Sequence, residues 1–198
     1  MMMIRPCKPG DADRLEYICL HASEDPMTDN PLFREAVLEV FCRYYIAFEA
    51  ENCFVAVDEQ NEAQGYILCA PAFCDYEKRL RSYLSDRTAN PVLSMMAEGT
   101  LNGLRPYASQ YPAHLHIDLL PACQGQGIGR KLIRTLCDHL GKDETGGLML
   151  NVSNTNTGAI RFYEKCGFSL LEKGERECAY GIRLVTQEAK EDTQNAAV

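Results

Sequence analysis

Three glycines within five residues, Gly125, Gly127 and Gly129, constrain the fold of this chain more than any other feature. A strand predicted at 113–120 precedes them, and an amphipathic helix predicted over 128–140 follows at once. Glycine lets the backbone turn tightly and approach a ligand, and a helix N-terminus offers unpaired N–H groups and a partial positive charge. This arrangement is typical of a pyrophosphate site. An ordinary strand-to-helix turn with packing glycines is the alternative.

The glycine spacing differs from two common phosphate-binding motifs. A P-loop needs GxxxxGK[ST], whereas Arg130 and Lys131 follow the spacing GxGxG here. A dinucleotide fingerprint needs GxGxxG after the first strand of a βαβ unit. Here the glycines lie late in the chain, and the strands predicted before them form a hairpin. Neither motif fits.

The predicted elements define a mixed α/β domain. Their order is β-α-α-β-β, an insertion at 71–112, and then β-α-β-α-β-β. The strand–helix–strand unit favours a parallel pair. We expect one domain over 1–186 built on a single twisted sheet, in which the insertion acts as a lid, and a disordered polar tail at 187–198.

Composition and charge narrow the choice of partner. The chain has 198 residues, 46% of them hydrophobic, and its apolar runs are far shorter than the ~20 residues that cross a bilayer. A net charge of −8 argues against nucleic acid or an anionic membrane as partner. The segment Met1–Lys8 lacks the apolar region of a secretory signal, so we expect no such signal, and the ten cysteines include no CxxC pair. We therefore expect reduced thiols and a cytoplasmic protein.

Two motifs resemble those of the GNAT superfamily of N-acetyltransferases. The run Gln124-Gly-Gln-Gly-Ile-Gly129, after Leu120-Pro121, is similar to the family's Q/R-x-x-G-x-G/A motif. The second motif, N-x-x-A-x-x-F-Y-x-x-x-G-F, is matched by Asn156, Ala159, Phe162, Tyr163, Gly167 and Phe168. The resemblance covers about residues 2–185 and implies a mostly antiparallel sheet with a central parallel pair and flanking helices. The HIDLLP run from His116 also resembles the acetyltransferase-like domain attached to O-GlcNAc hydrolases.

The resemblance implies acetyl-CoA as the acyl donor. Backbone N–H groups of the glycine turn, with Arg130, would hold the pyrophosphate, which agrees with the helix N-terminus argument. A bulge near 118–120 would splay the strand from its neighbour and free backbone groups for the pantetheine arm. The implied contact residues are Leu119, Leu120, Gln124, Gly125, Gln126, Gly127, Ile128, Gly129, Arg130, Asn156 and Tyr163. Asn156 could equally be a helix N-cap.

Tyr163, Asp118 and His116 are the candidate catalytic residues. The resemblance makes Tyr163 the general acid that protonates the CoA thiolate, although its ring could simply pack in the core. An amine acceptor must lose a proton before it attacks. His114, His116 and Asp118 alternate along one strand, so they share a face and supply candidate bases, with structural hydrogen bonds as the alternative. We expect no metal, because His114, His116 and Cys123 lack a fourth ligand.

Two functions follow from these expectations. The first is direct transfer of an acetyl group to an amine of a small molecule or a protein, and the second is a non-catalytic acyl-CoA-binding domain. A homodimer through the last strands is a further expectation. The basic cluster of Lys78, Arg79 and Arg81 is either a solvated helix face or a site for the 3′-phosphate of CoA.

Overall fold

A seven-stranded sheet forms the centre of the molecule, in the order β1-β2-β3-β4-β5-β7-β6. The computed structural model describes residues 2–22, 29–87, 89–141 and 145–184. The strands are β1 (Met3–Pro6), β2 (Phe54–Val57), β3 (Ala63–Ala70), β4 (Ala113–Leu119), β5 (Gly147–Ser153), β6 (Ser169–Lys173) and β7 (Glu177–Arg183). The β4–β5 pair is parallel and every other pair is antiparallel. This confirms the predicted fold class.

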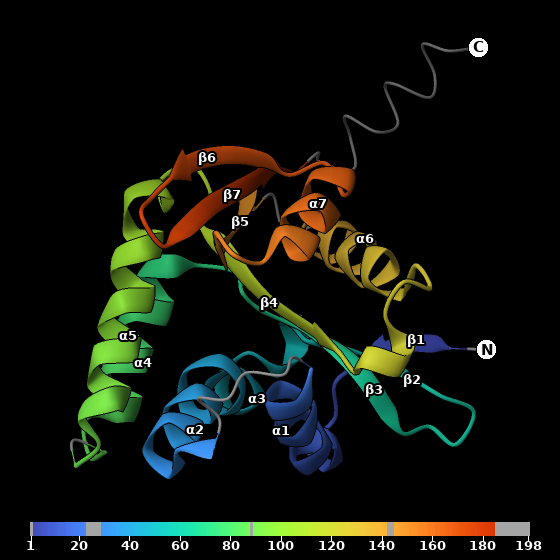
Figure 1. Cartoon of the computed structure of the whole chain (residues 1–198), viewed down its shortest axis with the longest axis horizontal. Helices are drawn as coiled ribbons and strands as arrows, with labels where there is room; N and C mark the ends of the chain where they lie inside the picture. Colours follow the sequence, from blue (N-terminus) through green and yellow to red (C-terminus); the bar gives the residue numbers. More distant parts are fainter. Residues whose placement is uncertain (1, 23–28, 88, 142–144, 185–198) are drawn as a thin grey trace.

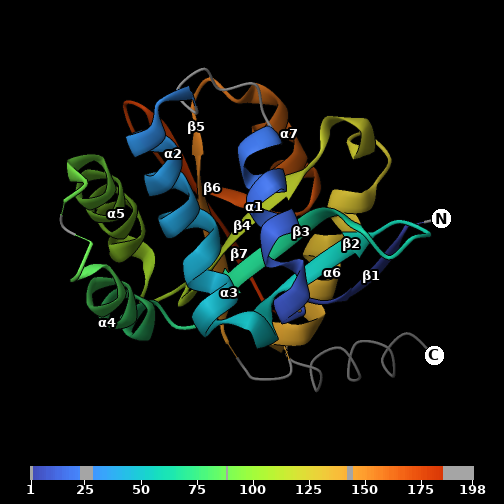
Figure 2. The same ribbon diagram turned by 90° about the horizontal axis from the view of Figure 1, so that it is seen from below.

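Helices cover both faces of the sheet (Figures 1 and 2). One face carries α1 (Ala12–His21), α2 (Pro31–Leu38), α3 (Tyr44–Phe48), α4 (Phe73–Leu84) and α5 (Pro91–Leu104). The other carries α6 (Ile128–Leu140) and α7 (Thr157–Lys165). Short 3-10 turns, η1 (Pro9–Asp11), η4 (Ala50–Asn52), η5 (Arg105–Tyr107) and η6 (Pro121–Cys123), connect the elements. No described helix is long and apolar enough to span a membrane.

Strand β4 divides its side chains between two hydrophobic cores. Ala113 and Leu115 are buried beneath α6 and α7. Because side chains alternate along a strand, His114 points to the opposite face, where its ring contacts Tyr45 and Tyr76. The polar residues of β4 therefore lie beneath α1–α5, as the alternation predicts.

The parallel pair β4–β5 opens after two residues. Pairing is limited to Ala113 with Leu148 and His114 with Met149, although both strands continue. The predicted bulge near 118–120 is wrong, because β4 stays in register with β3 without a shift from His114 to Leu119. The opening arises instead because β4 stays paired with β3 while β5 stays paired with β7. The splay that the bulge was expected to produce is nevertheless present.

The second predicted helix contains a π-helical turn. Asn30 caps α2 by accepting hydrogen bonds from the N–H groups of Leu32 and Phe33. The helix then widens at η3 (Glu39–Arg43), a π turn that leads directly into α3. Apolar spacing predicted the helix but not this turn, which accommodates one extra residue.

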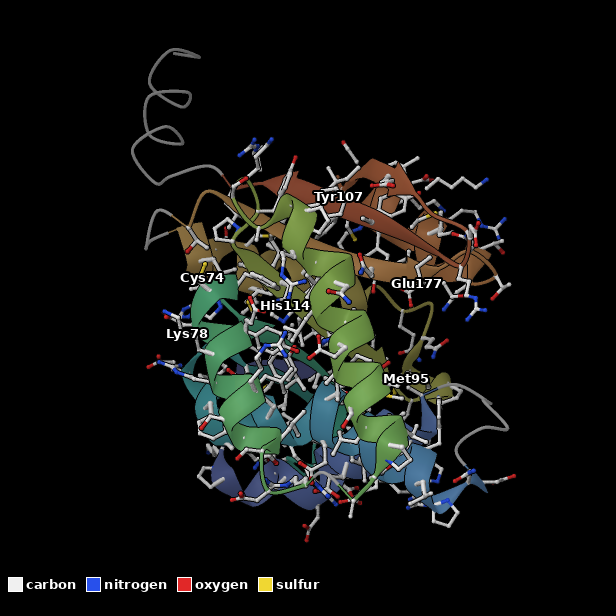
Figure 3. All side chains as sticks on the ribbon, turned by 90° about the vertical axis from the view of Figure 1, so that its left-hand side faces the viewer. Cys74, Lys78, Met95, Tyr107, His114 and Glu177 are labelled. Atoms are coloured by element: carbon white, nitrogen blue, oxygen red, sulfur yellow. The ribbon has the colours of Figure 1, made fainter. Side chains whose placement is uncertain are left out.

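The insertion at 71–112 forms α4, α5 and η5, and their apolar faces belong to the core. Leu80, Leu93 and Leu101 are buried, whereas Lys78 projects to solvent in Figure 3. Arg79 pairs with Glu49, and Arg81 pairs with Glu77 and Glu98. These pairs place the basic cluster on a charged helix surface. The role of the insertion as a lid stays a prediction.

All ten cysteines are free thiols that form no disulfide in the structure. Four of them belong to the buried core: Cys42, Cys53, Cys69 and Cys178. The polar tail predicted at 187–198 lies outside the described residues.

Candidate active site

A cleft of about 720 Å³ lies beside the end of β4, beyond the residues of that strand that pair with β5. Its walls come from the end of β4, the glycine turn, the first turn of α6 and one side of α7. The lining residues are Ala22, Ile117, Asp118, Leu119, Cys123, Gln124, Gly125, Gly127, Gly129, Arg130, Asn156, Gly158, Ala159, Arg161, Phe162, Tyr163 and Lys165. Both sequence motifs therefore meet at one site, although they are separated by a helix and a strand.

Glycine is required at three points of the turn for two different reasons. Gly125 and Gly127 have φ angles of +73° and +77°, in the left-handed region that other residues rarely adopt. A Cβ at either would meet nothing within 4 Å, so the backbone there faces open space. At Gly129 a Cβ would lie 3.0 Å from Cζ of Phe162, so glycine lets α6 and α7 pack closely.

The N-terminus of α6 is free to bind an anion. Gly127 occupies the N-cap position and no side chain caps the helix. The first-turn N–H groups are therefore available, and the helix dipole makes this end partly positive. The Gln124 side chain fixes the turn by donating to the carbonyl oxygens of Leu119, at 2.9 Å, and Ala22, at 3.2 Å.

Eight of the eleven predicted cofactor contacts line the cleft, and three side chains do not. The backbone N–H of Leu120 donates to Gln64, and its side chain packs against the core beneath α1–α5. The side chain of Gln126 turns back to the carbonyl oxygen of Ala122 at 2.8 Å. Ile128 is buried in the core beneath α6. The roles of these eleven residues in binding stay predictions.

Asn156 caps the N-terminus of α7 and also lines the cleft. Its Oδ1 accepts a hydrogen bond from the N–H of Ala159 at 3.0 Å, which caps α7. It also lines the cleft. The N-cap is therefore part of the cleft wall.

Tyr163 lines the cleft from α7. Its side chain is 9% exposed and packs against Phe162 and Phe168. Its hydroxyl has no hydrogen-bond partner among the residues that the structure describes. Burial raises the pKa of Tyr163, and the negative charge of Asp118 raises it further. An unpartnered hydroxyl on a residue that lines the cleft, near a carboxylate, is available to a bound ligand.

Asp118 is the candidate base that reaches the cleft. One carboxylate oxygen accepts a 2.5 Å hydrogen bond from the hydroxyl of Tyr66 on β3. Burial raises the pKa of Asp118 to about 6, against the lowering effect of this hydrogen bond. Asp118 is therefore ionised near neutral pH but accepts a proton more readily than an exposed aspartate does.

His116 does not line the cleft. Its ring packs edge-on against Phe41 and Tyr45, and its buried Nε2 has no partner within the described residues. Burial lowers the pKa of His116 to about 4, so the ring is neutral at pH 7. His114 is equally enclosed, and its Nε2 lies 2.8 Å from the Tyr45 hydroxyl. His114 therefore makes a structural hydrogen bond, which was the alternative to a catalytic role, whereas Nε2 of His116 makes none within the described residues. The catalytic role of His116 stays a prediction.

Two cations in the cleft were missed by the sequence analysis. Arg161 and Lys165 stand one turn apart on α7 and line the cleft with Arg130. Neither Arg161 nor Lys165 forms an ion pair within the described ranges. Their i, i+4 spacing is the sequence signal, but it also fits a solvated helix face. In a protein of net charge −8, this cluster of cations favours an anionic ligand.

We expect Asp118→Asn to stabilise the protein at neutral pH. The pKa of Asp118 in the fold, about 6, exceeds its ordinary 3.8, so the folded chain binds more protons between these values. Stability from this group is therefore lost as pH rises through that window. Asparagine keeps an acceptor for Tyr66 and removes the buried charge. Urea unfolding should show a gain of at most about 3 kcal/mol at pH 7.5 and little change at pH 3.5.

The exposed Asp86→Asn, at the end of α4, controls for the loss of one negative charge. An equal effect of both variants at pH 7.5 would show that burial of Asp118 has no energetic consequence.

No cluster of three or more potential metal-ligating side chains occurs within the described part of the chain.

Solved structures share this fold. The crystal structure of SsHAT is 26% identical in sequence, with a TM-score of 0.81 over 93% of this chain and 98% of that chain. The structure of yncA from Salmonella typhimurium, a putative acetyltransferase with its cofactor acetyl-CoA, is 18% identical, with a TM-score of 0.57 over 93% and 94% of the two chains.

The model of the acetyltransferase (GNAT) family matches residues 19–168, and the protein belongs to this family. This confirms the resemblance seen in the two motifs. Among curated proteins, the mycothiol acetyltransferase of Streptosporangium roseum is 47% identical over 49 residues. That match covers 25% of this chain and 14% of the length of the enzyme.

Proposed function

We propose that the protein is an acetyl-CoA-dependent N-acetyltransferase that transfers the acetyl group directly to an amine. The observation that carries the proposal is the cleft, which brings an uncapped helix N-terminus, an unpartnered tyrosine hydroxyl and a carboxylate to one place. Family membership supports acetyl transfer in general. Acetyl-CoA is present in the yncA structure and in that of a phosphinothricin acetyltransferase from Sinorhizobium meliloti.

The shape and charge of the cleft suit the parts of acetyl-CoA. The pyrophosphate would lie against the glycine turn and Arg130, where N–H groups and the helix dipole favour negative charge. Arg161 and Lys165 add positive charge for the phosphates. The pantetheine arm would enter between β4 and β5, whose facing backbone groups are unpaired with each other after His114 and Met149. The thioester would then lie near Asp118 and Tyr163.

The proposed reaction removes two protons from the acceptor nitrogen and delivers one proton to the CoA sulfur. Asp118 takes a proton from the ammonium form of the acceptor, directly or through water, and the free amine attacks the thioester carbon. The C–N bond forms as the C–S bond breaks, and the CoA thiolate takes the proton of the Tyr163 hydroxyl. The nitrogen then loses its second proton to the Tyr163 phenolate, which restores the hydroxyl and leaves the neutral amide, and Asp118 releases its proton to water. Burial raises the pKa of Tyr163, but the thiolate leaves in the same buried place, where its own proton affinity is also raised.

Titration with acetyl-CoA and turnover of amines test this proposal together. We expect acetyl-CoA to bind in a calorimeter and a panel of primary amines to release free CoA thiol. Binding without release for every amine would favour the alternative, a non-catalytic acyl-CoA-binding domain. The engagement of Asp118 by Tyr66 favours that alternative, because it occupies one oxygen of the candidate base. A folded protein that fails to bind acetyl-CoA would overturn both functions.

The proposal includes a cytoplasmic location, because ten free thiols suit a reducing compartment.

Removing two cleft cations should weaken acetyl-CoA binding. We expect the double variant Arg161→Gln and Lys165→Gln to raise the Kd about tenfold at low salt, because each lost pair with a phosphate contributes about 0.5–1 kcal/mol. The difference from wild type should shrink at high salt, where these charges are screened. Calorimetric titration at two salt concentrations measures both effects.

The matched control is Arg34→Gln with Lys173→Gln, which changes net charge equally at exposed positions of α2 and β6, outside the cleft. An equal loss of affinity in this control would show that net charge, and not the cleft, is responsible.

A further inference from the structure

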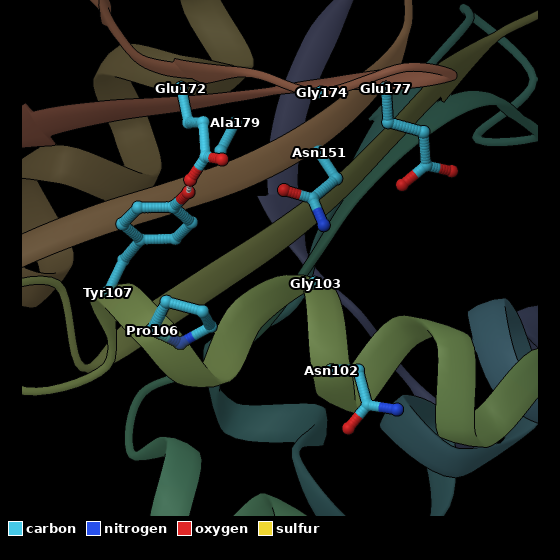
Figure 4. A pocket seen from close by; sticks show the side chains of 9 residues that line it. All are labelled: Asn102, Gly103, Pro106, Tyr107, Asn151, Glu172, Gly174, Glu177 and Ala179. Carbon is cyan, nitrogen blue, oxygen red and sulfur yellow. Dashed lines mark hydrogen bonds between the residues drawn. The ribbon is translucent and has the colours of Figure 1, made fainter.

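A second cavity lies on the face of the sheet opposite α6 and α7. It has a volume of about 240 Å³ and lies between the end of α5 and strands β5, β7 and β6 (Figure 4). Its lining residues are Asn102, Gly103, Pro106, Tyr107, Asn151, Glu172, Gly174, Glu177 and Ala179. None of them lines the acetyl-CoA cleft.

Two local features build this cavity. A Cβ at Gly103 would lie 2.2 Å from Nδ2 of Asn151, so glycine on α5 leaves room for that amide. A bulge at Leu171 lets Leu170 pair with Tyr180 and Glu172 with Ala179. Without the extra residue, Glu172 would face the opposite side of the sheet, because side chains alternate along a strand. The bulge thus turns Glu172 into the cavity.

The polar lining favours a cation. Two carboxylates, of Glu172 and Glu177, face the cavity with the side-chain amide of Asn151, and no lining residue is basic. The hydroxyl of Tyr107 donates to Glu172. Neither Glu177 nor the Asn151 amide has a side-chain partner within the described residues. Their oxygens are therefore free to accept hydrogen bonds from an ammonium or guanidinium group.

The cavity stands on the same face of the sheet as Asp118 and close to the opening of the parallel pair. Asn151 is two residues beyond the last paired position of β5, and Asp118 is four residues beyond that of β4. At a rise of about 3.3 Å per residue, the two side chains are offset by about 7 Å along the strands. The side chain of Asn154 donates to Gly174, which holds the β6–β7 turn against the end of β5. This contact joins the β6–β7 side of the cavity to the end of β5, two residues before Asn156 of the cleft wall.

We propose that this cavity holds the second positive charge of a small amine acceptor while its reacting nitrogen lies near Asp118. The inference rests on the proposed function and names its substrate class, a short aliphatic amine with a second cationic group. The volume supports a small ligand, because drug-sized ligands occupy about 300–1,000 Å³. The net charge of −8 draws such cations toward the protein.

Chain-matched acceptors test the proposal. Release of CoA thiol is measured with α,ω-diamines of three to eight carbons and with the amino alcohols of equal length, which lack the second charge. We expect kcat/KM for the best diamine to exceed that of its amino alcohol by up to about fivefold for each of the two carboxylates, because an exposed ion pair contributes at most about that factor. Glu172→Gln with Glu177→Gln should bring this ratio close to one. Glu175→Gln, in the same turn but outside the cavity lining, should leave the ratio unchanged.

A binding experiment separates this inference from the proposed function. 1,5-Diaminopentane is titrated into the protein saturated with CoA, and acetyl-CoA is titrated into the same variants. Diamine binding that is lost in the double glutamate variant, with acetyl-CoA binding retained, would support the proposal. Equal kcat/KM for diamines and amino alcohols, or preferred acetylation of a lysine-containing peptide over every diamine, would overturn it while leaving acetyl transfer established. Absence of acetyl-CoA binding in the wild type would instead refute the proposed function.

Discussion

Replacing Gly127 by glutamate is expected to weaken acetyl-CoA binding at least 100-fold while the protein stays folded. Gly127 has a φ of +77°, and a Cβ there would point into open space beside the N-terminus of α6. A carboxylate at this point would occupy the place of the pyrophosphate and repel it, and 100-fold corresponds to about 2.7 kcal/mol. Calorimetric titration of both proteins measures the change.

The glutamate also strains the backbone, so a control with equal strain is needed. Gly146 has a φ of +72°, and its Cβ would likewise meet nothing within 4 Å, but it lies outside the cleft. We expect Gly146→Glu to lower the free energy of unfolding by a similar 1–2 kcal/mol, roughly the penalty of a left-handed residue, and to bind acetyl-CoA normally. Equal binding by Gly127→Glu and wild type would rule out the glycine turn as the pyrophosphate site.

Replacing Tyr163 by phenylalanine should reduce kcat about 100-fold and leave the Kd for acetyl-CoA nearly unchanged. The change removes one hydroxyl, whose loss deprives the CoA thiolate of its proton donor, and general acids contribute roughly 10²–10⁴ in rate. The fold should be unaffected, because the hydroxyl has no hydrogen-bond partner among the described residues. Steady-state thiol release, with thermal unfolding of the same samples, measures both properties.

Tyr180→Phe is the matched control for this change. Tyr180 is also buried, but its hydroxyl donates to Glu164 at 3.1 Å and lies outside the cleft lining. We expect this variant to lose about 1 kcal/mol of stability and no activity. Tyr163→Phe should therefore lower kcat without lowering stability, and Tyr180→Phe should lower stability without lowering kcat. An unchanged kcat in Tyr163→Phe would reduce Tyr163 to a packing residue.

The spacing of apolar residues and the order of predicted strands and helices were sufficient to predict the elements around the cleft. The apolar stripe of α6 predicted Ile128–Leu140, the bounds found in the structure, because one face of this helix is buried throughout. The parallel pairing of β4 with β5 followed from the helix between them. The family resemblance added the expectation that the two strands separate, which the structure shows without the bulge.

Contacts between distant segments were beyond prediction. Alternation along β4 placed His116 and Asp118 on one face, but Phe41 and Tyr45 from a remote helix enclose the histidine and leave the carboxylate at the cleft. Arg161 and Lys165 were missed because charges on a helix look alike whether they face a ligand or water. The bulge at Leu171 has no signal in the sequence, since it depends on pairing with β7.

The π turn at η3 has a consequence for comparing this chain with its relatives. A helix with one π turn holds one residue more than an α-helix of the same span, so a relative without the turn should align here with a one-residue gap between Glu39 and Arg43. If an alignment places this gap at another position, each residue of α2 is matched to the neighbour of its true counterpart in the relative. A shift of one residue corresponds to about 100° around the helix axis. Buried and exposed positions of Pro31–Leu38 would then be confused, and residue roles in this helix should be transferred by superposition of structures.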